Sequence, residues 1–234
     1  MRHEQPKAVI FDLDDTLYPL RRFVHSGFAA VADHLADTWR VDRREAIGVL
    51  ARASRGESRG RELQVCVAHF GLSPSIMSAL VQVIRLHAPS LRLPRASRFA
   101  LEALRPDWYI GVVTNGLPDL QARKVDALGL RELVDTIVYA NEVGAGDGKP
   151  DREPFLEAAR RLGVTTDRAM FVGDDARCDV FGAGQVGMKT VHVTRRGRAH
   201  VPAYCADATI TTLAVLPAIA ERLVPDLRWR SYVA

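Results

Sequence analysis

The sequence contains few cysteines and no long hydrophobic run. Its 234 residues include only Cys66, Cys178 and Cys205, which are widely spaced and form no C-x-x-C pair. This spacing argues against a zinc or dithiol redox motif and favours reduced thiols in a cytoplasmic protein. No apolar run approaches the roughly 20 residues that a membrane-spanning helix needs. The N-terminal MRHEQPKAVIF also lacks the apolar stretch of a signal peptide, so we expect a cytoplasmic protein.

A strong charge of one sign and internal repeats are also absent. The formal net charge is +4, with 26% charged and 47% hydrophobic residues, which is typical of a globular domain. A basic excess of this size can steer anionic small molecules toward a protein. It is too small and too dispersed to indicate binding of a nucleic acid polymer. The sequence therefore favours a small anionic substrate, with no nucleic acid and no membrane as partner, and leaves the oligomeric state open.

Five short apolar runs predict the buried strands of a parallel sheet. They lie at residues 7–11, 109–113, 136–140, 169–172 and 189–193. Helical patterns follow the second, third, fourth and fifth runs. They cover residues 120–128, 153–162, 179–186 and 212–223. Alternating strands and helices predict an α/β fold with right-handed crossovers.

The segment between the first two strands contains no strand pattern. Helical patterns occur there instead, at residues 27–38, 43–53, 61–70 and 74–87. An insertion of this length is too long for a loop in a compact domain, so we interpret it as a small all-helical cap. The predicted organisation is core at 1–17, cap at 18–97 and the remaining core at 98–234.

Carboxylates follow the first strand directly. In an open α/β sheet, ligands bind outside the carboxyl ends of the strands. Asp12 and Asp14 are two residues apart, so an extended chain points them to the same side. Such a pair can divide its roles, with one carboxylate attacking and the other transferring protons. The alternative is a polar turn, and we favour that simpler role for Asp15.

Three later strand ends add groups suited to binding a phosphate and a cation. Thr114 and Asn115 end the second strand and offer a hydroxyl and backbone N–H groups, although, taken alone, they fit a plain polar turn better. Lys149 lies in a Gly-rich loop and is either a phosphate-neutralising ammonium or a surface lysine. The fourth strand ends in an acidic cluster that suits Mg²⁺ or caps a helix. Its members are Asp174, Asp175 and Asp179.

Together, these pieces resemble the haloacid dehalogenase superfamily. The matching segments are AVIFDLDDTL (8–17), VVTNG (112–116), GKPD (148–151) and FVGDDARCDVFGAGQVGM (171–188). The helical insertion is similar to the cap of the first subfamily. The resemblance implies a Rossmann-like core with a five-stranded parallel sheet flanked by helices, and a phosphatase similar to pyrimidine 5′-nucleotidases.

The resemblance also implies a role for each motif residue. Asp12 would be the nucleophile that forms a phosphoaspartyl intermediate, and Asp14 would be the general acid and base. Lys149 would balance charge, while Thr114 and the Asn115 amide would bind the phosphoryl oxygens. Magnesium would be bound by residues from two motifs: Asp12, the Asp14 carbonyl, Asp174 and, directly or from behind, Asp179.

The substrate is predicted only as a class. A small phosphorylated metabolite is expected, with a nucleoside monophosphate or a sugar phosphate as first guesses. Arg21 and Arg22 follow the nucleophile loop and either bind the leaving group or are simply solvated. A dehalogenase and a phosphoaspartate receiver domain are disfavoured by Asp14. A phosphomutase and a non-catalytic regulatory domain of the same fold remain as alternatives.

Overall fold

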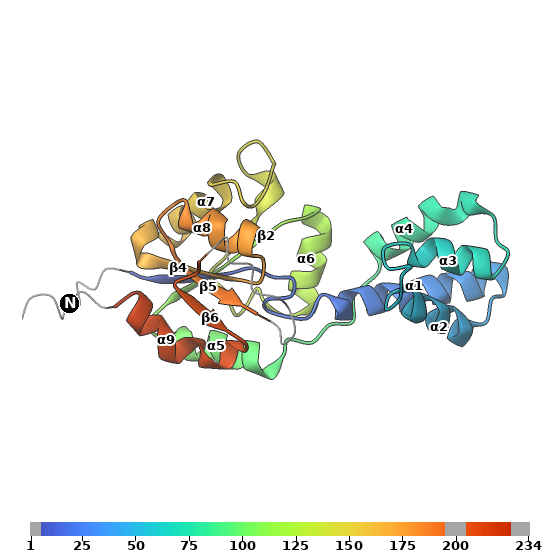
Figure 1. Cartoon of the computed structure of the whole chain (residues 1–234), viewed down its shortest axis with the longest axis horizontal. Coiled ribbons are helices and arrows are strands. Elements are labelled where there is room, and N and C mark those ends of the chain that lie inside the picture. The colour runs from blue at the N-terminus through green and yellow to red at the C-terminus, as the bar shows by residue number, and fades with distance from the viewer. Residues whose placement is uncertain (1–5, 195–204, 226–234) are drawn as a thin grey trace, which may run out of the picture. The chain divides into compact units, whose positions relative to one another are not determined.

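The computed structural model describes residues 6–194 and 205–225 (Figure 1). The chain divides into two compact units. A core unit consists of Met1–Pro19 and Arg92–Ala234, and a helical unit consists of Leu20–Leu91. The sequence-based cap boundaries at 18 and 97 lie near these limits and stay a prediction.

The core unit is built on a parallel sheet with the order β3-β2-β1-β4-β5-β6. Five of its strands are those expected from sequence, and the expectation of only five is wrong. The described residues contain a sixth strand, which has three residues and pairs only with β5 at the edge of the sheet, so it leaves no apolar run to detect. The strands are β1 (Ala8–Phe11), β2 (Tyr109–Thr114), β3 (Thr136–Tyr139), β4 (Ala169–Gly173), β5 (Lys189–Val193) and β6 (Ala208–Ile210).

Helices cover both faces of the sheet. Figure 1 shows α7 (Glu153–Leu162) and α8 (Gly182–Gly184) on one side, and α5 (Arg95–Leu104) and α9 (Leu216–Leu223) on the other. The apolar face of α7 buries Phe155, which contacts Phe171 of β4 edge-on with ring centroids 4.9 Å apart. The sequence analysis did not predict α5. The order of the strands reverses between β1 and β4, which is where open α/β sheets bind ligands.

The segment after β4 differs from the regular helix expected over residues 179–186. A π-helical turn occupies Ala176–Phe181 and α8 follows as a single short turn, ending before Gly187 at φ 83°. The residue that follows this turn, Gly182, packs closely against α7. A side chain at Gly182 would put its Cβ 2.7 Å from the Phe155 ring. Turns of π-helix are frequent at functional sites, where they redirect a side chain.

The helical unit has its own apolar core. Its helices are α1 (Arg21–Trp39), α2 (Arg43–Ala53), α3 (Glu62–His69) and α4 (Met77–Leu86). Phe28, Val31 and Leu35 lie on one face of α1 and pack with residues of the other three helices. The Asp42 side chain accepts a hydrogen bond from the Glu45 N–H and so caps α2. The described elements of this unit are all helices, as the sequence predicted. Its first helix, α1, begins six residues before the predicted Gly27.

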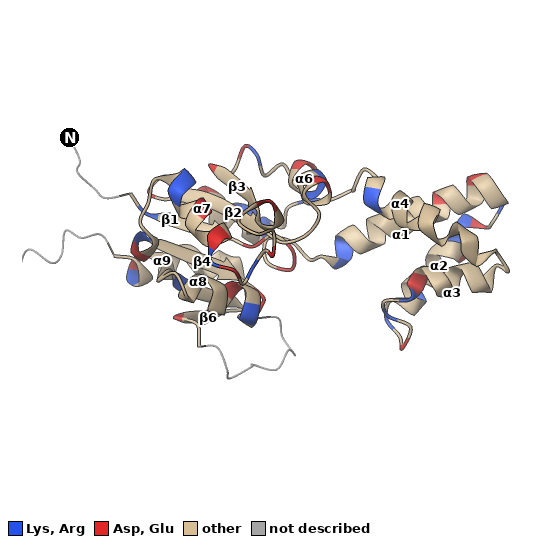
Figure 2. Ribbon diagram, turned by 90° about the horizontal axis from the view of Figure 1, so that it is seen from above, with Lys and Arg blue, Asp and Glu red and all other residues tan. Residues whose placement is uncertain are grey.

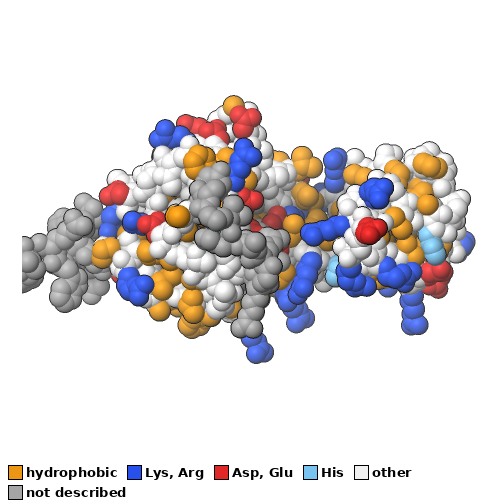
Figure 3. All heavy atoms as spheres, in the orientation of Figure 1, with side chains coloured by type: hydrophobic (Ala, Val, Ile, Leu, Met, Phe, Trp, Pro, Cys, Tyr) orange, Lys and Arg blue, Asp and Glu red, His pale blue; other side chains and the backbone are white. Residues whose placement is uncertain are grey.

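The surface carries both signs of charge. Red acidic and blue basic segments occur in both units (Figure 2), and hydrophobic and charged side chains are interspersed on the face drawn in Figure 3. Among the helices that the structure describes, none combines the length and the apolarity needed to cross a bilayer.

The amino end of β1 is joined to α9 by an ion pair in which Lys7 is buried and Glu221 is half exposed. Lys7 Nζ donates to both carboxylate oxygens of Glu221 at 2.8 and 2.9 Å and lies 4.6 Å from the centroid of Trp108. The Trp108 indole donates to the same carboxylate at 3.0 Å. Because Lys7 is buried, this carboxylate stabilises its charge.

We expect Glu221→Leu to lower the free energy of unfolding by about 1–2 kcal/mol, because it removes a half-exposed carboxylate that faces a buried ammonium. Urea denaturation measures the loss. Glu102→Leu is the matched control, because its ion pair with Arg98 is exposed and 3.5 Å long. Equal losses in both variants would contradict the role given to the buried ammonium.

Candidate active site

One pocket of about 190 Å³ lies at the carboxyl ends of the central strands. The nucleophile loop after β1, the last residue of β2, the loop after β3 and the residues after β4 all contribute to it. It is therefore located at the reversal in strand order. Its lining residues are Asp12, Asp14, Thr114, Asn115, Lys149, Asp174, Asp175, Cys178 and Asp179. The structure thus brings together every core-unit residue to which the sequence analysis gave a catalytic, binding or metal role.

Lys149 connects two buried carboxylates. Its Nζ donates to Asp12 Oδ1 and to Asp179 Oδ1, both at 2.7 Å. Burial favours the uncharged form of the lysine and lowers its pKa, but the attraction of both carboxylates outweighs that effect and the pKa is raised overall. Lys149 therefore stays an ammonium, and its burial excludes the alternative of a surface lysine.

Asp12 lies in a setting that disfavours its own charge. Its backbone N–H continues the sheet by donating to the Val172 carbonyl at 2.9 Å, which fixes the carboxylate at the end of β1. Burial raises the pKa of Asp12 to about 7, and repulsion from Asp179 adds to the effect while Lys149 opposes it. A carboxylate in this position is stabilised by any further positive charge that enters the pocket.

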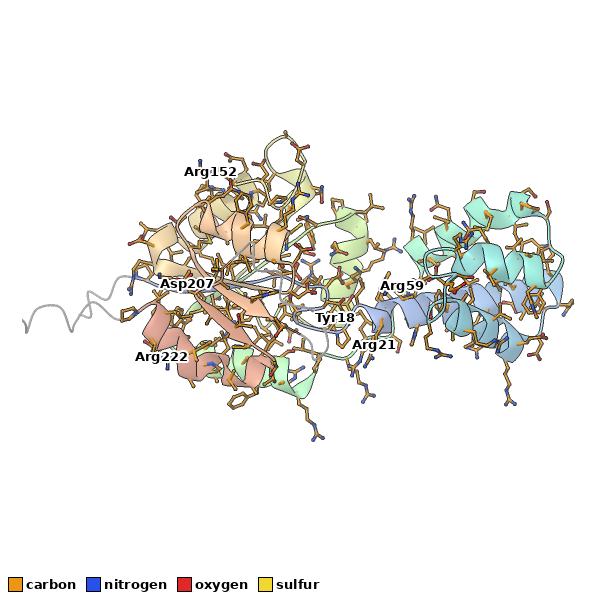
Figure 4. All side chains as sticks on the ribbon, viewed as in Figure 1. Tyr18, Arg21, Arg59, Arg152, Asp207 and Arg222 are labelled. Carbon is orange, nitrogen blue, oxygen red and sulfur yellow. The ribbon has the colours of Figure 1, made fainter. Side chains whose placement is uncertain are left out.

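Asp14 is held by three side-chain donors. Tyr18 (labelled in Figure 4) donates its hydroxyl to Asp14 Oδ1 at 2.6 Å. Gln121 Nε2 and Lys124 Nζ donate to Asp14 Oδ2 at 3.0 and 2.7 Å. Burial, followed by the nearby Asp14 charge, raises the pKa of Tyr18, so its hydroxyl keeps its proton. Asp15 turns the loop in the left-handed region at φ 61°, in line with the turn role we favoured for it.

The Asn115 side chain fastens the loop that carries Lys149. It accepts from the Lys149 N–H at 2.8 Å and donates to the Lys149 carbonyl at 2.9 Å. The loop approaches so closely that a Cβ at Gly148, which has φ 73°, would lie 2.8 Å from Asn115 Oδ1. With its side chain used in this way, Asn115 has its backbone N–H left as the group for an anion.

Three carboxylates could share a cation. Ligand atoms of Asp12, Asp174 and Asp179 all lie within 4.8 Å of one another. Asp179 Oδ2 also accepts from the Asp175 N–H at 3.0 Å, and a Cβ at Gly173 would overlap that carboxylate. Glycine is therefore required at the end of β4.

Asp175 has a different function from its neighbour. Its Oδ1 accepts from the N–H groups of Arg177 and Cys178 at 2.9 and 2.7 Å and caps the π-helical turn. Asp175 is thus the capping residue, and Asp174 belongs to the group of carboxylates that could hold a cation.

Arg21 and Arg22 belong to the other unit. They are the first two residues of α1 and both are exposed (Figure 4 labels Arg21). Their contact with a substrate stays a prediction.

The sequence analysis missed Gln121 and Lys124. Both lie on α6 (Pro118–Ala127) and are buried, with exposed fractions of 2% and 4%. A signal was present, because Gln121, Lys124, Val125 and Leu128 follow the helical spacing of a buried face. Lysine is almost never buried without a partner, so its place on that face indicates a carboxylate opposite it.

Comparison with known proteins identifies the family. The model of the haloacid dehalogenase-like hydrolases matches residues 6–187. Glyceraldehyde 3-phosphate phosphatase of Methanopyrus kandleri is 32% identical over 216 residues, covering 82% of this chain and 85% of that protein. Pyrimidine 5′-nucleotidase YjjG of Escherichia coli is 31% identical over 114 residues, 48% of this chain and 50% of that protein.

A solved structure gives the same answer for the fold. The crystal structure of 2-haloacid dehalogenase from Pseudomonas syringae pv. Tomato is 29% identical, with a TM-score of 0.65, and the match covers 93% of this chain and 99% of that one. The family match spans more than half of the chain and includes the whole pocket. The resemblance read from the motifs is confirmed, and the chain belongs to the haloacid dehalogenase-like hydrolase family.

Proposed function

We propose that the protein is a phosphatase that hydrolyses a small phosphomonoester through a phosphoaspartyl intermediate on Asp12. The observation that carries the proposal is the pairing of Asp12 with a buried ammonium, beside a second carboxylate in the same pocket. A phosphate dianion and a carboxylate repel each other, and a fixed cation between them offsets that repulsion.

The carboxylate cluster fits Mg²⁺. This ion prefers oxygen ligands and takes one or two carboxylates while retaining water and substrate oxygens. Asp12 and Asp174 would bind it, together with the Asp14 carbonyl. Asp179, whose two oxygens already accept from Lys149 and the Asp175 N–H, would support the site from behind. When bound, the ion neutralises charge on the phosphate and on Asp12.

In the first step, a carboxylate oxygen of Asp12 attacks phosphorus. The bond between phosphorus and the ester oxygen breaks, and the leaving oxygen takes a proton from the Asp14 carboxyl group. The products are an alcohol, the Asp14 carboxylate and phosphoaspartate. Lys149, the Thr114 hydroxyl and the Asn115 N–H stabilise the charge on the phosphoryl oxygens.

In the second step, water attacks the phosphorus of phosphoaspartate. The water gives a proton to the Asp14 carboxylate, and the bond between phosphorus and the Asp12 oxygen breaks. Inorganic phosphate leaves, and both carboxyl groups return to their starting states.

Dehalogenation, the activity named for the similar solved structure, is disfavoured by Asp14. A halide leaves as a stable anion and needs no proton donor. Here three side chains hold a second carboxylate in the pocket, which is an arrangement for proton transfer. A sugar phosphomutase uses the same groups and remains the second candidate.

The substrate is a small phosphorylated metabolite. The glyceraldehyde 3-phosphate phosphatase of Methanopyrus kandleri, described above, supports a triose phosphate as one member of the class. The half-length match to a nucleotidase keeps nucleoside monophosphates in it. Arg21 and Arg22 would bind the leaving group, and a cytoplasmic location agrees with the free cysteines.

A metabolite panel with and without metal tests the proposal. We expect release of inorganic phosphate from at least one triose phosphate, sugar phosphate or nucleoside monophosphate in the presence of Mg²⁺. Excess chelator should lower the rate by at least about 100-fold, because one charge-neutralising group is lost, and added Mg²⁺ should restore it. Full activity in chelator contradicts the metal assignment. Interconversion of sugar phosphates without phosphate release identifies a mutase.

A further inference from the structure

Gln121 forms a buried connection between the acid–base carboxylate of Asp14 and the Thr114 hydroxyl, and Lys124 adds a second donor to that carboxylate. Gln121 Nε2 donates one hydrogen to Asp14 Oδ2 and the other to Thr114 Oγ1. Lys124 Nζ donates to the same Asp14 oxygen at 2.7 Å. Both donors come from α6, one helical turn apart, so a single rigid element sets the position of both.

We propose that Gln121 and Lys124 are positioning residues that fix the orientation of the Asp14 carboxyl group for proton transfer to the leaving oxygen. This inference rests on the proposed phosphatase function. Proton transfer requires heavy atoms about 2.6–3.2 Å apart, so a freely rotating carboxyl group is a poor acid.

Gln121 and Lys124 are placed more rigidly than the carboxyl group that they hold. The Asp14 side chain is 23% exposed, whereas the Lys124 side chain is 5% exposed, so the anchor is more deeply buried than the group it holds. Helices position functional groups more rigidly than loops do, and Asp14 itself lies on a loop. Tyr18, which donates to the other Asp14 oxygen, lies on that same loop, so α6 supplies the two donors that come from outside the loop.

Two esters that share one intermediate distinguish this role from a general structural one. An alkyl phosphate releases a strongly basic alkoxide, which must be protonated as it leaves. 4-Nitrophenyl phosphate releases a stable anion, which leaves without a proton. A residue that acts through Asp14 therefore affects kcat/KM for the first ester much more than for the second.

The experiment uses Lys124→Met in the full-length protein with Mg²⁺. We expect kcat/KM for the alkyl ester to fall about 100-fold, the lower range of a general-acid contribution, and that for the nitrophenyl ester by less than about fivefold. Gln121→Leu, which keeps the ammonium, should show the same selectivity and serves if the first variant fails to fold. Arg131→Met is the control, because it removes an exposed ion pair with Asp126 near the end of the same helix.

Each outcome decides the matter. Equal losses with both esters, no loss, or a gain with the alkyl ester overturns the positioning role. Loss confined to the alkyl ester supports it. If the unmodified protein hydrolyses neither ester nor any metabolite of the panel, the proposed function fails, and that result is distinct from a failure of this inference.

Discussion

We expect Asp12→Asn to lower the rate of phosphate release by a factor on the order of 10⁴ or more and to leave the fold unchanged. An amide has nearly the shape of a carboxylate but is a far weaker nucleophile, so the phosphoaspartate no longer forms. The Lys149 ammonium keeps Asp179 as a partner at 2.7 Å, so one neutral side chain does not leave it unpaired. Phosphate release under saturating substrate and Mg²⁺ measures the effect, and circular dichroism checks the fold.

Acid quenching gives a second readout. The unmodified protein stopped during turnover should carry one phosphate on Asp12, found by mass spectrometry, and the variant should carry none. Asp126→Asn is the control, because it makes the same chemical change on the exposed part of α6. Retained turnover in Asp12→Asn would contradict the mechanism. A phosphate on another residue would show that the nucleophile is not Asp12.

The sequence predicted those parts of the fold whose signals are local. Runs such as the one at β4 are apolar because the strand is buried on both faces. Such a run can be recognised in the sequence without knowledge of the strands that pair with it. β6 has only three residues and forms by pairing with the edge of β5. This pairing depends on the tertiary structure and leaves no signal in the local sequence. The close packing of Gly182, directly after the π-helical turn at Ala176–Phe181, against the Phe155 ring is likewise set by residues distant in sequence.

The candidate site likewise contains residues that local motifs predicted and residues that depend on tertiary contacts. The order of the motifs was sufficient to predict that Asp12, Thr114, Lys149 and Asp174 would meet, because parallel strands end at one edge of a sheet. The side chains that hold Asp14 could not be predicted from the order of the motifs. Lys124 comes from the helix after β2, and its side chain had to be recognised as buried before a carboxylate was sought for it.

The second large effect is expected at Lys149. Lys149→Met leaves the buried Asp12 and Asp179 carboxylates facing each other without the cation between them. Removing one partner from a buried ion pair costs about 3–5 kcal/mol, so the free energy of unfolding in chelator should fall by that amount. Turnover with Mg²⁺ should fall by about 10³-fold, because a fixed charge beside the phosphate is lost.

A second substitution separates stability from catalysis. Adding Asp179→Asn to Lys149→Met removes one of the two opposed charges, so the double variant should recover at least about 1 kcal/mol of unfolding free energy relative to Lys149→Met. It should recover no turnover, because the phosphate still lacks its ammonium. Urea denaturation in chelator and phosphate release with Mg²⁺ report the two quantities independently. A double variant less stable than Lys149→Met would show that the like charges are not what destabilises the single variant, whereas recovered turnover would move the catalytic cation away from Lys149.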